Sequence, residues 1–156
     1  MSAAFAESGH SCVLQRMTVL SPYAMIALTQ VFEGDAKSGH SSIRKAIERN
    51  PDYPFFYRYT EGMALFHQER FEEAEKIFQS ALERNPEFLA ARLALVSTLE
   101  HLGRSDDAEW EFEEVLVRQP DFSLLQEQAR APYANTGDTL RYIKGLEAAA
   151  KGAVRK

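Results

Sequence analysis

Two histidines, His67 and His101, lie 34 residues apart and could in principle share a metal ion. Imidazole nitrogens are common zinc ligands, but a zinc site takes three or four protein ligands. The equivalent position upstream is Phe32, so the same spacing supplies no third ligand. We therefore interpret both histidines as residues at the rim of the fold. Neither a metal nor another cofactor is expected.

Runs of acidic residues could supply paired carboxylates for general acid and base catalysis. The residues concerned are Glu72, Glu73, Glu75, Glu109, Glu111, Glu113 and Glu114. Both runs lie beside the apolar stripe of a predicted helix, and acids in a first turn interact favourably with the helix dipole. We interpret them as solvated helix faces. The single cysteine, Cys12, has no basic neighbour that would lower its pKa, and no nucleophile–base pair or phosphate loop is recognisable. The sequence thus predicts a protein that is not an enzyme.

Composition narrows the possible partners. The chain of 156 residues is 45% hydrophobic and 26% charged, which is typical of one globular domain. Its formal charge of −5 and its lack of Lys/Arg clusters argue against nucleic acid as a partner. No apolar run approaches the roughly 20 residues that cross a bilayer. Because Glu7, Gly9 and Arg16 interrupt the first residues, no signal peptide is recognisable. We expect a cytoplasmic protein without membrane contact.

The elements that position these residues follow from an internal repeat. Glu83-Arg84-Asn85-Pro86 repeats Glu48-Arg49-Asn50-Pro51 after 35 residues, and Arg118-Gln119-Pro120 follows 34 residues later. A period of this length is typical of stacked helical hairpins. The predicted fold is therefore all-α, with hairpins over about residues 20–53, 54–88 and 89–121. Residues 1–19 form an arm or a short helix in this interpretation, and residues 121–156 form capping helices and a tail.

Turn residues and apolar spacing place the individual helices. The pattern predicts helices over residues 55–68, 71–84, 87–102 and 105–118, with Ser105 as an N-cap. Trp110 interrupts an acidic helix, and we expect it to pack against the last helix, with an exposed partner contact as the alternative. In that last helix, Leu140, Ile143 and Leu146 are predicted to cover the third hairpin, because a repeat stack needs a cap.

Small and packing residues recur at matching offsets in the second and third hairpins. They are Gly62, Leu65, Ala74, Phe78 and Ala81, followed by Leu99, Ala108, Phe112, Val115 and Pro120. On these residues, about positions 20–120 resemble the tetratricopeptide repeat (TPR) family. Its units are antiparallel helix pairs that stack into a superhelix and bind other proteins. The resemblance implies a non-catalytic interaction module, an adaptor or scaffold, with a protein or peptide partner.

The tail carries a second resemblance. Its residues are Pro120-Asp121-Phe122-Ser123-Leu124, Pro132-Tyr133 and Leu140-Arg141-Tyr142-Ile143-Lys144-Gly145-Leu146. They are similar to the end of the TPR region in bacterial class III adenylate cyclase-like proteins. No cyclase catalytic domain is recognisable, so the resemblance implies only the interaction part of such a bacterial signalling system.

In the TPR family, the first helix of each hairpin lines the inner surface of the superhelix. Matching the repeat phase predicts a partner-binding groove formed by Leu28, Val31, Phe56, Tyr59, Met63, Phe66, Leu93 and Ser97. Such an apolar groove would accept a helix or an extended peptide. Alternatively, the capping helix or the N-terminal arm fills it, or it packs in a homodimer.

Some family members clamp acidic carboxylates of chaperone tails with Lys, Arg and Asn. Here the corresponding positions hold Ala24, Leu28, Tyr59, Met63, Leu93 and Ser97. The predicted function is therefore binding of an apolar partner segment in the groove. The alternatives are a small TPR-type chaperone or a self-associating, possible homo-oligomeric, assembly element of a cyclase-like system.

Overall fold

The computed structural model describes residues 22–153, and this part of the chain contains eight α-helices and no strand. The helices are α2 (Pro22–Phe32), α3 (Ala36–Arg49), α4 (Phe55–His67), α5 (Phe71–Arg84), α6 (Leu89–His101), α7 (Ser105–Arg118), α8 (Leu124–Arg130) and α9 (Thr136–Ala153). The prediction of an all-helical fold is confirmed. The predicted N-terminal arm and Cys12 lie outside the described residues.

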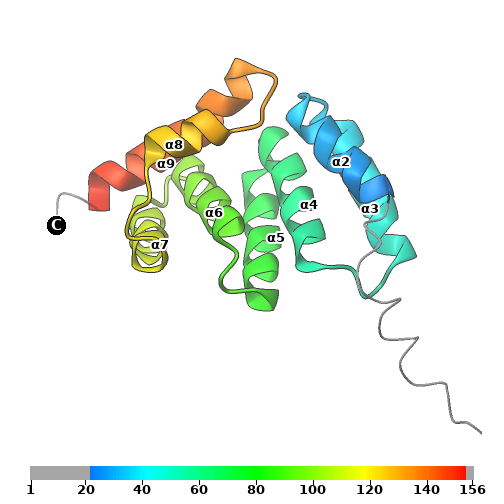
Figure 1. Cartoon of the computed structure of the whole chain (residues 1–156), viewed down its shortest axis with the longest axis horizontal. Helices are drawn as coiled ribbons and strands as arrows, with labels where there is room; N and C mark the ends of the chain where they lie inside the picture. Colours follow the sequence, from blue (N-terminus) through cyan, green and yellow to red (C-terminus); the bar gives the residue numbers. More distant parts are fainter. Residues whose placement is uncertain (1–21, 154–156) are drawn as a thin grey trace, which may run out of the picture.

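Helices α2 to α7 form three consecutive hairpins that stack side by side (Figure 1). Within the stack, α3 packs on α4 and α5 packs on α6. The last helix does not extend this series. Instead, α9 runs across the stack and packs on both α6 and α7, while the short α8 lies beside it. None of the described helices is both long and apolar enough to cross a membrane.

Asparagine–proline pairs end the second helices of the first two hairpins. Asn50 and Asn85 adopt extended backbone angles, with φ of −135° and −146°. Proline disfavours helical angles in the residue before it, so Pro51 and Pro86 stop α3 and α5. The repeated motif is thus the point at which one hairpin ends and the next begins.

Small residues let the two helices of a hairpin approach closely. A Cβ atom on Gly62 would lie 2.5 Å from the Phe78 ring, so that ring packs directly on the α4 backbone. Ala74 and Ala81, one turn on either side of Phe78, are fully buried. The repeat-matched residues Ala108, Phe112 and Val115 are buried in the same way in α7. The core therefore has two parts: one cluster extends through the second and third hairpins to α9, and a second one, around Ile43 and Tyr57, joins the first hairpin to α4.

The helix bounds agree with the sequence pattern except at the ends. Helices α5 and α7 have the predicted limits. Helix α6 begins at Leu89, because the Glu87 amide is held by the Asn85 side chain in the preceding turn, at 3.2 Å. Ser105 is the first residue of α7, so its predicted role as N-cap is wrong.

Side-chain burial corrects two further predictions. In α9, Ile143 and Leu146 are buried as predicted, but Leu140 is 45% exposed. Trp110 is 57% exposed, so the prediction that it packs in the core is wrong. The reason is its phase: Ala108, Phe112 and Val115 form the buried stripe of α7, and Trp110 points away from that stripe.

Helix α9 depends on a glycine where it crosses α6. A Cβ atom on Gly145 would lie 2.7 Å from the Cα atom of Ser97, which is backbone and cannot rotate away. We therefore expect Gly145→Ala to lower the free energy of unfolding by about 1–3 kcal/mol, as overpacking does. Urea unfolding followed by circular dichroism measures this change.

Gly152→Ala in the same helix is the matched control. The three atoms nearest to a Cβ atom there all belong to the flexible Glu109 side chain. Because alanine favours helix over glycine by about 1 kcal/mol, this control should be neutral or stabilising. Equal effects of the two substitutions would contradict close packing of α9 on α6.

Candidate functional site

The structure divides the eight predicted groove residues into a buried and a partly exposed group. Leu28, Phe56 and Tyr59 are partly exposed. The buried residues are Val31, Met63, Phe66, Leu93 and Ser97. The apolar members of the buried group share one core cluster with Tyr142, Ile143 and Leu146 of α9. Helix α9 packs on α6, so the capping helix covers this group at Ser97.

The direct contact between α6 and α9 centres on Ser97. Its hydroxyl Oγ donates a hydrogen bond to the carbonyl oxygen of Tyr142, at 2.9 Å. This bond satisfies a buried hydroxyl that would otherwise destabilise the fold. Ser97 therefore supports α9 and is not accessible to a partner in this arrangement.

The loop between α8 and α9 reaches the first hairpin, as Figure 1 also shows. The amide of Ala134 donates a hydrogen bond to the carbonyl of Phe32 at the end of α2, at 2.8 Å. Next to it, the Tyr133 ring packs edge-on against the rings of Phe32 and His67, with centroid distances of 5.5 and 4.8 Å. One short segment thus connects the first hairpin with the second.

His67 lies beneath this loop, and only 1% of its side chain is exposed. Its Nδ1 atom is 3.4 Å from an Asp138 carboxylate oxygen, yet neither ring nitrogen makes a well-aligned hydrogen bond. Asp138 in turn accepts a hydrogen bond from Arg141 Nη1 at 2.7 Å. Burial lowers the pKa of His67 to about 4, and the Asp138 carboxylate opposes that shift only in part. The ring is therefore neutral at pH 7.

The interpretation of His67 as a rim residue is wrong, because α9 and the preceding loop cover it. His101 is exposed and stacks on the Phe71 ring, with its Nε2 atom 2.9 Å from the Arg141 carbonyl. Within residues 22–153, no cluster of three or more His, Cys, Asp or Glu side chains could hold a metal ion. The two histidines contribute to packing around α9.

Glu127 connects α8 to this arrangement. Its carboxylate accepts a hydrogen bond from the Tyr142 hydroxyl at 2.8 Å. Burial raises the pKa of the Tyr59 hydroxyl, and the charge of Glu127 raises it further. None of the residues of α8 is buried, and Leu125 is 76% exposed. Helix α8 is thus held by few contacts.

A second buried charge lies between α3 and α4. Glu61 is 2% exposed and pairs with Arg58 at 2.8 Å, while Arg44 and His40 of α3 lie 3.8 and 3.9 Å away. Three basic side chains surround this carboxylate, so it has no free access to a substrate. This carboxylate joins the first two hairpins. The repeat pattern of the sequence did not predict that role.

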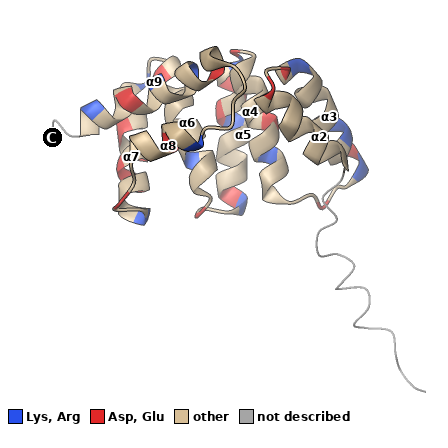
Figure 2. Ribbon diagram, turned by 45° about the horizontal axis from the view of Figure 1, so that its top comes forward, with Lys and Arg blue, Asp and Glu red and all other residues tan. Residues whose placement is uncertain are grey.

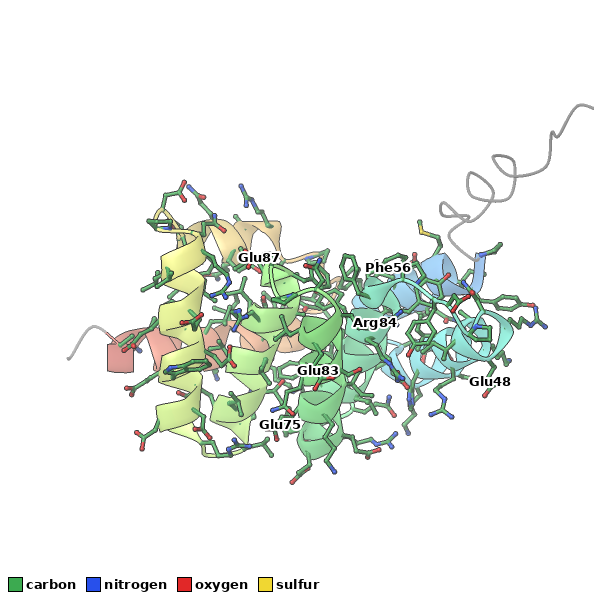
Figure 3. The ribbon with its side chains drawn as sticks, turned by 90° about the horizontal axis from the view of Figure 1, so that it is seen from below. Glu48, Phe56, Glu75, Glu83, Arg84 and Glu87 are labelled. Atoms are coloured by element: carbon green, nitrogen blue, oxygen red, sulfur yellow. The ribbon has the colours of Figure 1, made fainter. Side chains whose placement is uncertain are left out.

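Aromatic side chains remain partly exposed where α4 begins. Phe55 and Tyr59 both pack edge-on against Phe88, with ring centroids 4.9 and 5.2 Å apart. Phe56 lies beside them at the start of α4, next to α2 (Figure 3). We name Phe55, Phe56, Tyr59 and Phe88 the aromatic edge. The dense run of aromatic residues indicated the first three, whereas Phe88 was missed because it lies in the next turn.

Comparison with known proteins relates the chain to helical-repeat domains. A family model described as tetratricopeptide repeat matches residues 59–123. No curated protein matched the sequence. The fold is similar to the second TPR domain of human RPAP3, whose structure was determined with the HSP70 peptide SGPTIEEVD. The TM-score is 0.58 at 18% identity, covering 80% of this chain and 92% of that one.

A second similar structure is that of MamA from MSR-1, with a TM-score of 0.57 and 21% identity over 85% of this chain and 76% of that one. These likenesses show the fold, and the family match supports a relation to TPR proteins. The resemblance of the tail to cyclase-like proteins stays a prediction.

The buried His67 makes stability depend on pH. In the unfolded chain its pKa is near 6.5, whereas the folded protein keeps it neutral down to about pH 4. Between these values only the unfolded chain takes up the proton. The free energy of unfolding should therefore fall as the pH is lowered from about 6.5 towards 4, by at most about 1.4 kcal/mol per pH unit from this group.

Urea unfolding at several pH values measures this dependence. His67→Phe removes the titrating group but keeps a ring beside Tyr133, so its stability should decline less over the same range. His101→Gln, which retains His67, should decline as the unchanged protein does. Equal pH profiles for the unchanged protein and His67→Phe would contradict the assignment.

Proposed function

We propose that this chain, which is related over residues 59–123 to the tetratricopeptide repeat family, is a non-catalytic protein-interaction module that binds an apolar partner segment through its aromatic edge. The observation that carries the proposal is the group of partly exposed rings at the start of α4, beside an otherwise closed inner surface. A cytoplasmic location and a bacterial origin remain predictions from the sequence.

Large aromatic side chains are effective contact residues. They bury much apolar area with few rotatable bonds, and such anchors often dominate binding energies. In the aromatic edge, Phe55, Phe56 and Phe88 are already ordered by edge-on ring contacts. Binding would therefore cost little conformational entropy in these side chains. Leu28, which is also partly exposed, extends the same predicted groove.

The buried residues of the predicted groove have a supporting role in the proposed binding surface. Val31, Met63, Phe66, Leu93 and Ser97 support the inner surface from within the core. Among them, Ser97 would become accessible to a partner only if α9 moved away from α6. The proposal therefore assigns direct contact to Leu28, Phe56 and Tyr59 and assigns a supporting role to the buried five.

The expected partner segment is apolar rather than acidic. RPAP3 was solved with a peptide that ends in Glu-Glu-Val-Asp. In this chain, Tyr59, Met63 and Leu93 stand where other family members carry Lys, Arg or Asn, and the Glu127 carboxylate adds negative charge near Tyr59. An acidic tail would be repelled there, since like charges raise the free energy of the complex.

Site-specific photo-crosslinking tests the location of the contact. A photo-reactive residue at Phe56 should give crosslinks to a partner protein in the source cell. The same residue at Gln79, on the exposed face of α5, should not. Crosslinks from Gln79 alone would move the contact to the opposite side of the stack.

Affinity for the recovered partner tests the energetics. Phe55→Ala with Phe56→Ala should weaken binding about tenfold or more, because central aromatic anchors are removed. Gln79→Ala is the control. Circular dichroism and the melting temperature establish that the double variant is folded. Undiminished binding by the folded variant would refute the proposed surface.

A further inference from the structure

The second helix of each hairpin exposes one face to solvent, and we call these faces the back of the stack. Residues one repeat apart occupy equivalent positions on this surface and can be compared. Trp110 in α7 corresponds to Lys76 in α5 and Ser41 in α3. Val117 corresponds likewise to Glu83 and Glu48, which Figure 3 labels on α5 and α3. The back of the stack is thus polar in the first two hairpins and apolar at these two positions in the third.

The two apolar side chains of α7 are solvent-exposed. Trp110 is 57% exposed and Val117 is 73% exposed. They lie seven residues apart, which is two helical turns or about 10 Å on one face. Because the repeat does not need apolar residues here and α9 does not cover them, the core does not explain their presence.

Carboxylates surround this apolar pair. Helix α7 contains six acidic residues and one basic residue, Arg118. Asp106 precedes Trp110 by one turn on the same face, and Glu113 and Glu114 lie between Trp110 and Val117. Figure 2 shows the acidic colour along α7 and the basic colour on α3. Three of these acidic residues pair with arginines: Asp107 with Arg104, Glu111 with Arg92 and Glu114 with Arg118.

We propose that the exposed face of α7 is a second interaction surface, which binds a basic amphipathic helix of a partner protein. An apolar stripe on that helix, with residues about seven positions apart, would cover Trp110 and Val117. Lysine or arginine residues beside the stripe would face the acidic side chains of α7, among them Asp106. An indole ring is also a favourable site for a cationic side chain. This surface is separate from the aromatic edge, so the two proposals can fail independently.

The protein contains one tryptophan, so its fluorescence reports on this surface directly. The probe is a synthetic helical peptide with two leucines seven residues apart and lysines on either side of them. Titrated into the full chain, it should shift the emission of Trp110 to shorter wavelength and protect it from acrylamide. Added salt should weaken the effect, because exposed charges are screened. A twin peptide with glutamate in place of lysine should have no effect.

Variants that keep Trp110 complete the test. Val117→Ser removes one apolar contact and should weaken peptide binding about tenfold. Asp106→Lys should also weaken it. Glu83→Ser, the repeat-equivalent position in α5, should leave binding unchanged. Each substitution is at an exposed residue, so folding should be retained, as circular dichroism can verify.

Three results would overturn the proposal. The first is the absence of a saturable change with the basic peptide. The second is an equal effect of Val117→Ser and Glu83→Ser, or of the two peptides. The third is a fluorescence shift that follows protein concentration without peptide, which would identify a second copy of this chain as the occupant.

Discussion

The arrangement of the whole molecule depends on the close approach of α9 to α6, where Gly145 faces the backbone of Ser97. A larger residue in α9 would hold the two helices apart, and the Ser97 hydroxyl would lose its bond to the Tyr142 carbonyl. Through this contact, the last helix joins the core that also contains Met63 and Leu93. A stack of hairpins that would otherwise expose its inner surface therefore becomes a closed core over much of its length.

The closure also determines which surfaces remain for recognition. On the inner side, the partly exposed rings lie at the start of α4 and in the turn before α6. On the outer side, the third hairpin departs from the polar pattern of the first two at Trp110. Polar groups buried near α9, such as His67 and Asp138, hold the loop and the helix in place. The residues that stabilise the fold thus differ from those at the two proposed interaction surfaces.

The sequence predicted what depends on local spacing. The limits of α5 and α7 were predicted from the apolar periodicity and from the proline that follows each helix, because these features act within one hairpin. The covering of Ser97 did not follow, since it requires a helix that lies more than 40 residues further along the chain. Trp110 was assigned to the core from its residue type. The helical phase set by Ala108 and Phe112 was the better guide.

The loop at Ala134 bonds to Phe32 in the first described helix, and Arg141 pairs with Glu69 across 72 residues. Repeat arrays usually gain stability from neighbour to neighbour, so that each unit can order once the next is present. Here the first and second hairpins also contact a segment that the ribosome makes after all three hairpins. Growing chains would therefore carry uncovered apolar surface until that segment has been made, a stage at which aggregation competes with folding. This late closure makes the cell's chaperones relevant to the yield of the protein.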